Sequence, residues 1–171
     1  MQILLGAGSS RTKRFGGSSS WVNLHTVDFN ADHKPDTVHD LNVFPYPFED
    51  NCASEIHAYE VVEHLGQQGD FIAFFAFWSE IWRILEPNGL FIATSPMWNS
   101  AWAWGDPGHT RVISGESLIF LSQPSYAQIG KTPMTDYRFC YQADFDVVRS
   151  FDNNGCFEYA LQAIKPSRIN V

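Results

Sequence analysis

Short apolar runs, each closed by glycine, aspartate or proline, recur along the first part of the chain. They lie at residues 2–5, 23–28, 37–41 and 53–58. Runs of this length between turn residues are typical of buried strands. The pattern therefore predicts four strands before residue 60.

A longer amphipathic segment follows at residues 70–85. Apolar side chains recur there at helical spacing: Phe71, Phe74, Phe75, Trp78, Trp82 and Leu85. This spacing predicts a helix that begins after Asp70 as its N-cap and ends before the turn Pro87-Asn88-Gly89. Residues 90–94 then read as a buried strand that Pro96 ends.

The last third of the chain contains a hairpin signal. Two apolar runs, 145–149 and 157–164, flank Asp152-Asn153-Asn154-Gly155, which predicts a hairpin with one of the longer loops. Residues 98–141 show little periodicity and are expected to pass over one end of the sheet.

Strands that alternate with helices or loops and end in a hairpin predict an α/β fold. We expect a Rossmann-like, doubly wound, mostly parallel sheet with an antiparallel C-terminal hairpin, in a three-layer αβα arrangement. The length of 171 residues suits one domain. That domain, residues 1–171, would consist of a core (2–96), an excursion (97–143) and a hairpin (144–165).

Composition narrows the class of protein. Hydrophobic residues make up 44% of the chain, enough for a core, and the net charge is −8 with a pI of about 5.0. This acidity argues against a nucleic-acid partner. Cys52, Cys140 and Cys156 lie far apart, so neither disulfides nor a metal site are expected. The absence of a long apolar run or a signal peptide predicts a cytoplasmic protein without a membrane partner.

Residues that carry chemistry follow the predicted strands, where an open parallel sheet binds its ligands. Gly6-Ala7-Gly8 follows the first strand, and Asp28 closes the second, 20 residues after Gly8. Glycines let a ligand approach the backbone, and an acidic residue at this distance is typical of a ribose-binding carboxylate. A plain glycine turn and a helix-capping aspartate remain alternatives.

Two further segments follow the third and fourth strands. Asp40, in His39-Asp40-Leu41-Asn42, could accept a hydrogen bond from the amino group of a purine; alternatively it is a loop aspartate near prolines. In residues 56–65 a buried strand passes into a helical turn that is rich in titratable side chains.

Taken together, these segments resemble the class I S-adenosylmethionine (SAM)-dependent methyltransferases, in particular compact bacterial and phage members of the small-molecule type. The resemblance covers residues 2–96, in the family's order. It rests on Leu4-Leu5-Gly6-Ala7-Gly8, Val27-Asp28-Phe29-Asn30, His39-Asp40-Leu41-Asn42, Pro47-Phe48-Glu49-Asp50-Asn51, Val61-Val62-Glu63-His64-Leu65 and Arg83-Ile84-Leu85-Glu86-Pro87-Asn88-Gly89-Leu90. The later Asp106-Pro107-Gly108-His109-Thr110-Arg111 is also similar to a segment of these members.

The resemblance implies SAM as the cofactor and assigns its contacts to residues that follow the four strands. Gly6, Ala7 and Gly8 would line its methionine part, Asp28 would bind the ribose hydroxyls, Phe29 would stack on adenine, Asp40 and Leu41 would bind the adenine edge, and the backbone of Ala58, Tyr59 and Glu60 would face the methionine amino group and the sulfonium. The implied activity is methyl transfer by in-line displacement to an unidentified acceptor, expected to be a small molecule.

Other residues are candidates for the acceptor side of the site. His64, His109 and Glu63 are the candidate bases for the acceptor's proton. Substrate contacts are expected from Arg111 and from an aromatic wall of Trp98, Trp102 and Trp104. Structural roles remain open for each: a histidine that caps a helix, a surface ion pair, and tryptophans that pack a long loop onto the sheet.

Two departures from the family bear on the cofactor pocket. The first strand begins at residue 2, and residues 9–21 are rich in Gly, Ser and Arg where the family normally has a helix. We therefore expect a more open pocket, which a second copy in a homo-oligomer or the acceptor would cover.

Two other classes of function stay open. Gly6-x-Gly8 with Asp28 also suits a nicotinamide-dependent oxidoreductase, although position 11 is Arg11 and not a third glycine. The third possibility is a non-catalytic module that binds the cofactor.

Overall fold

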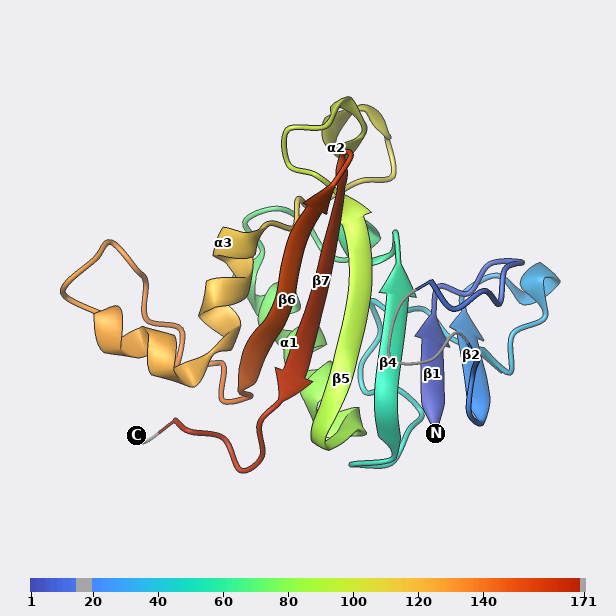
Figure 1. Ribbon diagram of the computed structural model, residues 1–171, viewed down its shortest axis with the longest axis horizontal. Helices are drawn as coiled ribbons and strands as arrows, with labels where there is room; N and C mark the ends of the chain where they lie inside the picture. Colours follow the sequence, from blue (N-terminus) through green and yellow to red (C-terminus); the bar gives the residue numbers. More distant parts are fainter. Residues whose placement is uncertain (15–19, 170–171) are drawn as a thin grey trace.

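The computed structural model describes residues 1–14 and 20–169, and this part of the chain forms one seven-stranded sheet in the order β3-β2-β1-β4-β5-β7-β6 (Figure 1). The strands are Gln2–Leu5 (β1), Leu24–Asp28 (β2), Thr37–Val38 (β3), Ala53–Tyr59 (β4), Leu85–Pro96 (β5), Phe145–Asn153 (β6) and Cys156–Ala163 (β7). The α-helices are Phe71–Ile84 (α1), Ala101–Gly105 (α2) and Gly115–Leu118 (α3). The Gly/Ser-rich stretch 15–19 lies outside the described residues.

Strand direction confirms the predicted fold class. β1 pairs in parallel with β2 and β4, β2 with β3, and β4 with β5. β7 is antiparallel to both β5 and β6. The sheet is thus Rossmann-like and mostly parallel with an antiparallel C-terminal hairpin, and the carboxyl ends of β1, β2 and β4 lie at one edge.

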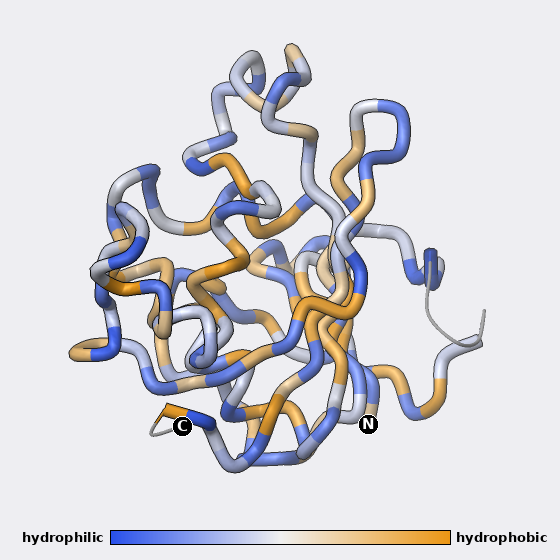
Figure 2. The backbone as a smooth tube through the Cα atoms, turned by 60° about the vertical axis from the view of Figure 1, so that its left-hand side comes forward, coloured by the Kyte–Doolittle hydropathy of each residue, from blue (hydrophilic) through white to orange (hydrophobic). Residues whose placement is uncertain are grey.

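Helix α1 covers the back of the sheet in the view of Figure 1. Its start is fixed as predicted, because the Asp70 carboxylate accepts a hydrogen bond from Ala73 N at 3.0 Å. Trp78 is fully buried, and its ring meets the rings of Phe91 on β5 and Phe145 on β6, with centroids 5.1 and 6.0 Å away. Figure 2 shows the hydrophobic stretches of the chain gathered in its interior. The aromatic stripe of residues 70–85 therefore forms core.

Three strand boundaries differ from prediction for local reasons. β3 stops at Val38 rather than 41, because Asp40 turns the chain by accepting a hydrogen bond from Asn42 N at 2.9 Å. β5 begins directly after α1, at Leu85, and so is longer than predicted. The predicted longer hairpin loop is wrong: Asn153 pairs with Cys156, which leaves a two-residue turn. Both turn residues, Asn154 and Gly155, have positive φ, as a tight hairpin turn requires.

On the front of the sheet, the described residues between β1 and β2 (6–14 and 20–23) form no helix; single side chains cover β1 and β4 instead. Lys13 is buried, and its Nζ lies 2.7 Å from Glu55 Oε2. The same carboxylate oxygen lies 2.8 Å from Nε2 of His57, which is fully buried. The Trp21 ring meets the His57 ring edge-on at 4.8 Å. A polar network under one tryptophan thus takes the place of an apolar helix face.

The His57 network predicts a pH-dependent stability. Burial lowers the pKa of His57, and the nearby Glu55 carboxylate opposes this only in part. The folded chain therefore binds fewer protons than the unfolded chain near pH 6.5, so the free energy of unfolding should decrease as the pH falls below about 6.5, by at most about 1.4 kcal/mol per pH unit. We expect His57→Gln, which keeps one donor and one acceptor, to remove this part of the decrease.

Urea unfolding of wild type and His57→Gln at several pH values between 7 and 4 tests this prediction. Glu55 should contribute separately, because hydrogen bonds and charges from Lys13 and His57 outweigh burial and lower its pKa. Its stabilising effect is present above the ordinary pKa of 4.5 and is lost as the pH falls below it. Parallel curves for the two proteins between pH 7 and 5 would contradict the assignment to His57.

The excursion after β5 folds back along the sheet. α2 lies beyond the end of β5, and α3 lies beside β6 (Figure 1). Buried hydrogen bonds hold residues of this excursion in place. The Tyr141 hydroxyl donates to Leu121 O at 3.0 Å, and Gln123 N donates to Asp144 Oδ1 at 3.0 Å. Among the described residues, none of the helices is long and apolar enough to span a bilayer.

Candidate functional site

A cavity of about 620 Å³ opens where β1, β2 and β4 end. This volume lies within the range of small-molecule sites. Its lining combines residues that follow each of the first four strands: Gly6, Gly8, Asp28, Phe29, His33, His39, Asp40, Leu41, Asn42, Glu60, Val61, His64 and Leu65. The fold thus brings together the glycine turn, Asp28 and Asp40, which are far apart in the sequence.

Asp28 joins the second strand to the glycine turn. Its Oδ2 accepts a hydrogen bond from Gly8 N at 2.7 Å, and its Oδ1 accepts one from Asn30 N at 2.8 Å. Burial would raise the pKa of Asp28, but these backbone donors and His33 outweigh it, so the pKa is lowered. Asp28 is therefore a charged acceptor at neutral pH, held rigidly at the cavity wall.

Arg11 helps to hold the glycine turn in place. Its guanidinium donates to Gly8 O at 2.7 Å and to His33 O at 3.1 Å. His33 Nδ1 in turn lies 3.3 Å from Asp28 Oδ1. The Arg11 guanidinium thus links the glycine turn to the turn that contains His33, through one backbone carbonyl of each.

The wall formed by Phe29 and Asp40 suits a flat, polar-edged ligand. Phe29 is 76% exposed, so its ring is accessible to a ligand in the cavity. Asp40 is exposed, and its Oδ1 accepts hydrogen bonds from the backbone and side-chain nitrogens of Asn42. Leu41 is buried beside them, with its carbonyl bound by the Tyr46 hydroxyl at 2.7 Å.

Of the remaining predicted cofactor residues, only Glu60 lines the cavity. Glu60 lines the cavity with a φ of 57°, a conformation uncommon for a residue other than glycine. Ala7, Ala58 and Tyr59 are absent from the cavity lining. Ala7 and Ala58 are buried, and the Tyr59 hydroxyl turns to the front network, 2.7 Å from His57 Nδ1. Their predicted backbone contacts with a cofactor stay predictions.

The three predicted bases lie close together, and one of them, His64, lines the cavity. Thr110 N and Arg111 N both donate to Glu63 O, at 2.9 and 3.0 Å, and so bring residues 106–111 to the turn at Val62–His64. The rings of His64 and His109 consequently lie 4.7 Å apart. Glu63 is almost fully buried; burial raises its pKa to about 8, and the charge of Glu60 adds to this.

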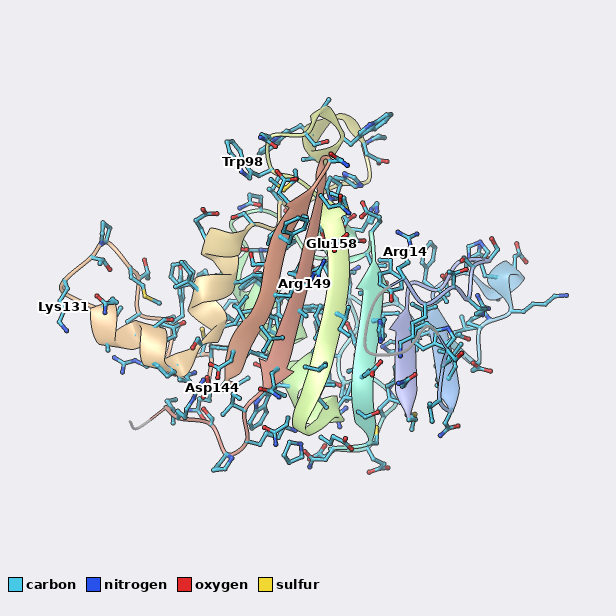
Figure 3. The ribbon with its side chains drawn as sticks, in the orientation of Figure 1. Arg14, Trp98, Lys131, Asp144, Arg149 and Glu158 are labelled. Carbon is cyan, nitrogen blue, oxygen red and sulfur yellow. The ribbon has the colours of Figure 1, made fainter. Side chains whose placement is uncertain are left out.

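Arg111 and the three tryptophans are not among the residues that line the cavity, so their predicted contacts with a substrate stay predictions. The buried Arg111 guanidinium donates to three backbone carbonyls, those of Leu65, Gln67 and Asp70, at 2.7 to 3.2 Å. This gives it a structural role in closing the loop before α1. The three tryptophans that were expected to form an aromatic wall, Trp98, Trp102 and Trp104, are 56%, 73% and 71% exposed. Trp98 lies at the end of the sheet beyond β6 and β7 (Figure 3).

Five further cavity residues were missing from the sequence-based site: His33, His39, Asn42, Val61 and Leu65. His39 and Asn42 flank Asp40, and Val61 and Leu65 flank Glu63 and His64, so the motifs themselves contained that signal. His33 follows Asp28 by five residues in a 3-10 turn capped by Asn30, whose side chain accepts from Asp32 N. The only sequence signal for His33 is the Asn30-x-Asp32 pattern, which is typical of the start of such a turn.

The chain resembles known proteins in its structure but not in its sequence. No family model matches the sequence. No curated protein matches it either. Among solved structures, a SAM-dependent methyltransferase from Archaeoglobus fulgidus aligns over 96% of this chain and 86% of its own, with a TM-score of 0.55 and 15% identity. One from Mesorhizobium loti aligns over 94% and 90%, with a TM-score of 0.58 and 11% identity. One from Aquifex aeolicus aligns over 96% and 82%, with a TM-score of 0.54 and 14% identity.

The chain therefore has the fold of the class I SAM-dependent methyltransferases. This agrees with the resemblance inferred from the motifs of residues 2–96.

Proposed function

We propose that the protein binds SAM in the cavity at the ends of β1, β2 and β4 and transfers its methyl group to a small-molecule acceptor. The observation that carries the proposal is the contact between Gly8 and Asp28. The 2.7 Å hydrogen bond places a charged carboxylate next to bare backbone at a cavity wall. A carboxylate in this position can accept hydrogen bonds from the two vicinal hydroxyls of a ribose.

The residues present fit SAM. The exposed Phe29 ring offers a stacking surface for adenine, and Asp40 offers an acceptor for its amino group. At the other end, Glu60 offers a negative charge to the methionine amino group and the sulfonium. When bound, SAM supplies an electrophilic methyl carbon: a lone pair of the acceptor forms the new bond, the carbon–sulfur bond breaks with its electrons on sulfur, and the acceptor loses its proton.

The protein's own contribution is to position the reactants. His64 lines the cavity, and the His109 ring lies against the His64 ring. The acceptor is therefore expected to enter the cavity beside His64. Much of the acceleration of such a displacement comes from orientation and from excluding water.

Two features favour SAM over a nicotinamide dinucleotide. The described residues after Gly8 (9–14 and 20–23) form no helix, so they give no helix N-terminus for a pyrophosphate. The dinucleotide sheet is parallel in the order 3-2-1-4-5-6, whereas here antiparallel β7 lies between β5 and β6. The fold thus weakens the oxidoreductase hypothesis.

Calorimetric titration with SAM, S-adenosylhomocysteine and NAD tests the proposal. We expect the first two to bind with one site per chain at micromolar affinity and NAD to show no saturable binding. Binding of NAD alone would overturn the proposal. SAM binding without turnover across a panel of hydroxyl, amine and thiol acceptors would support the non-catalytic cofactor-binding module instead.

A further inference from the structure

Three side chains of the kind that bind metals lie together beside the part of the cavity that His64 lines. Glu63 and His64 come from the 3-10 turn at Val62–His64, and His109 comes from the loop after α2. One ligand atom from each residue lies within 4.8 Å of the other two. The backbone hydrogen bonds to Glu63 O fix this approach between segments 45 residues apart.

Both histidines are oriented as metal ligands usually are. His64 Nδ1 lies 2.9 Å from Gly108 O, and His109 Nδ1 lies 2.8 Å from Trp102 O. A carbonyl oxygen only accepts, so each Nδ1 carries the hydrogen and each neutral ring keeps the lone pair on Nε2. In metal sites a ligating histidine typically donates its other ring N–H to a carbonyl or carboxylate in this way.

Glu63 supplies an acidic ligand that lacks a complete set of partners. Its side chain is almost fully buried; Oε2 accepts a hydrogen bond from Ser95 Oγ at 2.9 Å, whereas the buried Oε1 accepts none. The Glu60 carboxylate lies close to that of Glu63. Burying a carboxylate in this manner costs free energy unless a cation accompanies it.

We propose that Glu63, His64 and His109 together bind one divalent transition-metal ion, with Zn²⁺ as its representative. Two histidines and one glutamate, with a fourth position open, form a known ligand set of catalytic zinc. Nitrogen ligands also favour Zn²⁺, Fe²⁺ or Co²⁺ over Mg²⁺ and Ca²⁺, which take oxygen. Ligands of one tetrahedral Zn²⁺ stand roughly 3.4 Å apart, so ligand atoms that now lie within 4.8 Å of one another need to approach by up to about 1.4 Å.

His64 is part of the cavity lining, so an ion bound to it would be accessible from the cavity. A hydroxyl or thiol acceptor that binds the ion releases its proton to water more readily and keeps its lone pair for the methyl carbon. This role of the ion rests on the proposed methyl transfer, whereas the metal site itself does not.

Titration of the chelator-treated, tag-free full chain with ZnCl₂ by calorimetry tests the site, and the visible absorption of added Co²⁺ reports its ligands. We expect one ion per chain, and a loss of affinity of at least about 100-fold in each of Glu63→Gln, His64→Gln and His109→Gln. The matched control is His39→Gln, a cavity histidine outside the cluster, which should bind Zn²⁺ as the wild type does. Should the buried Glu63→Gln fail to fold, the exposed His64→Gln still tests the site.

The proposal is overturned if the wild type binds no stoichiometric ion, if His64→Gln and His109→Gln retain its affinity, or if His39→Gln loses as much as they do. SAM titration of the chelator-treated chain is a separate measurement. Zn²⁺ binding without SAM binding would overturn the proposed function alone, and SAM binding without Zn²⁺ binding would overturn the metal site alone.

Discussion

Replacement of Asp28 by asparagine should weaken SAM binding about 100-fold. The carboxylate lies at the cavity wall as a charged acceptor. An amide in its place carries no charge and has one acceptor oxygen instead of two, so the hydrogen bonds to the two ribose hydroxyls would be lost or weakened. Hydrogen bonds to a charged group contribute about 1.5–3 kcal/mol each, so a combined loss of about 3 kcal/mol corresponds to roughly two orders of magnitude in affinity. Calorimetric titration with SAM measures the change directly.

A matched control for this variant is Asp36→Asn. Asp36 is a second aspartate whose carboxylate accepts backbone and hydroxyl hydrogen bonds from Thr26, at 2.8 and 2.7 Å, but it does not line the cavity. Its SAM affinity should stay within about twofold of the wild type. Equal weakening in both variants would contradict a ribose contact by Asp28. Asp28→Ala is a poorer choice, because it also leaves Gly8 N and Asn30 N without their acceptor.

Gly6→Ala should destabilise the protein by about 3 kcal/mol or more. Gly6 has a φ of 57°, and a Cβ there would lie within 3.0 Å of the Val61 side chain, closer than real contacts allow. Gly8→Ala is the matched control: its φ of 52° imposes similar backbone strain, yet nothing lies within 4 Å of its Cβ. Strain alone costs about 1 kcal/mol, so the difference between the two variants isolates the clash.

Urea unfolding of both variants and of the double variant Gly6→Ala/Val61→Ala measures this difference. Val61→Ala removes the atoms that the new Cβ would meet, so it should restore part of the free energy of unfolding that Gly6→Ala loses. In the wild type the same substitution should only lower the free energy of unfolding. The prediction fails if Gly6→Ala and Gly8→Ala unfold at the same urea concentration.

Periodicity was enough to predict most of the fold. The strands that became β1, β2 and β4, and helix α1, were each predicted to within one or two residues, because a buried strand and an amphipathic helix leave distinct patterns. The hairpin at Asn154-Gly155 was predicted with too long a loop, since the pairing of Asn153 with Cys156 depends on register, which local composition does not specify.

The candidate site could be predicted only as far as strand ends indicate it. Gly8, Asp28 and Asp40 line one cavity because parallel strands end at the same edge of a sheet. This rule can be applied to strands that are predicted from the sequence alone. The contact between His64 and His109 has no such rule, because it is created by the backbone hydrogen bonds from Thr110 N and Arg111 N to Glu63 O, between residues far apart in the sequence. The structural roles of Arg11 and Arg111 were equally hidden, since a sequence does not show which carbonyls a guanidinium will meet.

The two sides of this sheet are held by different forces. Behind it, Trp78 and its aromatic neighbours contribute apolar burial, which weakens on cooling and is little affected by ionic strength. In front of it, Lys13 and Glu55 contribute a charge pair beneath Trp21, whose strength depends on proton activity and does not decline on cooling as apolar burial does. Cold should therefore loosen the sheet from the helical side first, and acid should loosen it from the side that faces away from the helix.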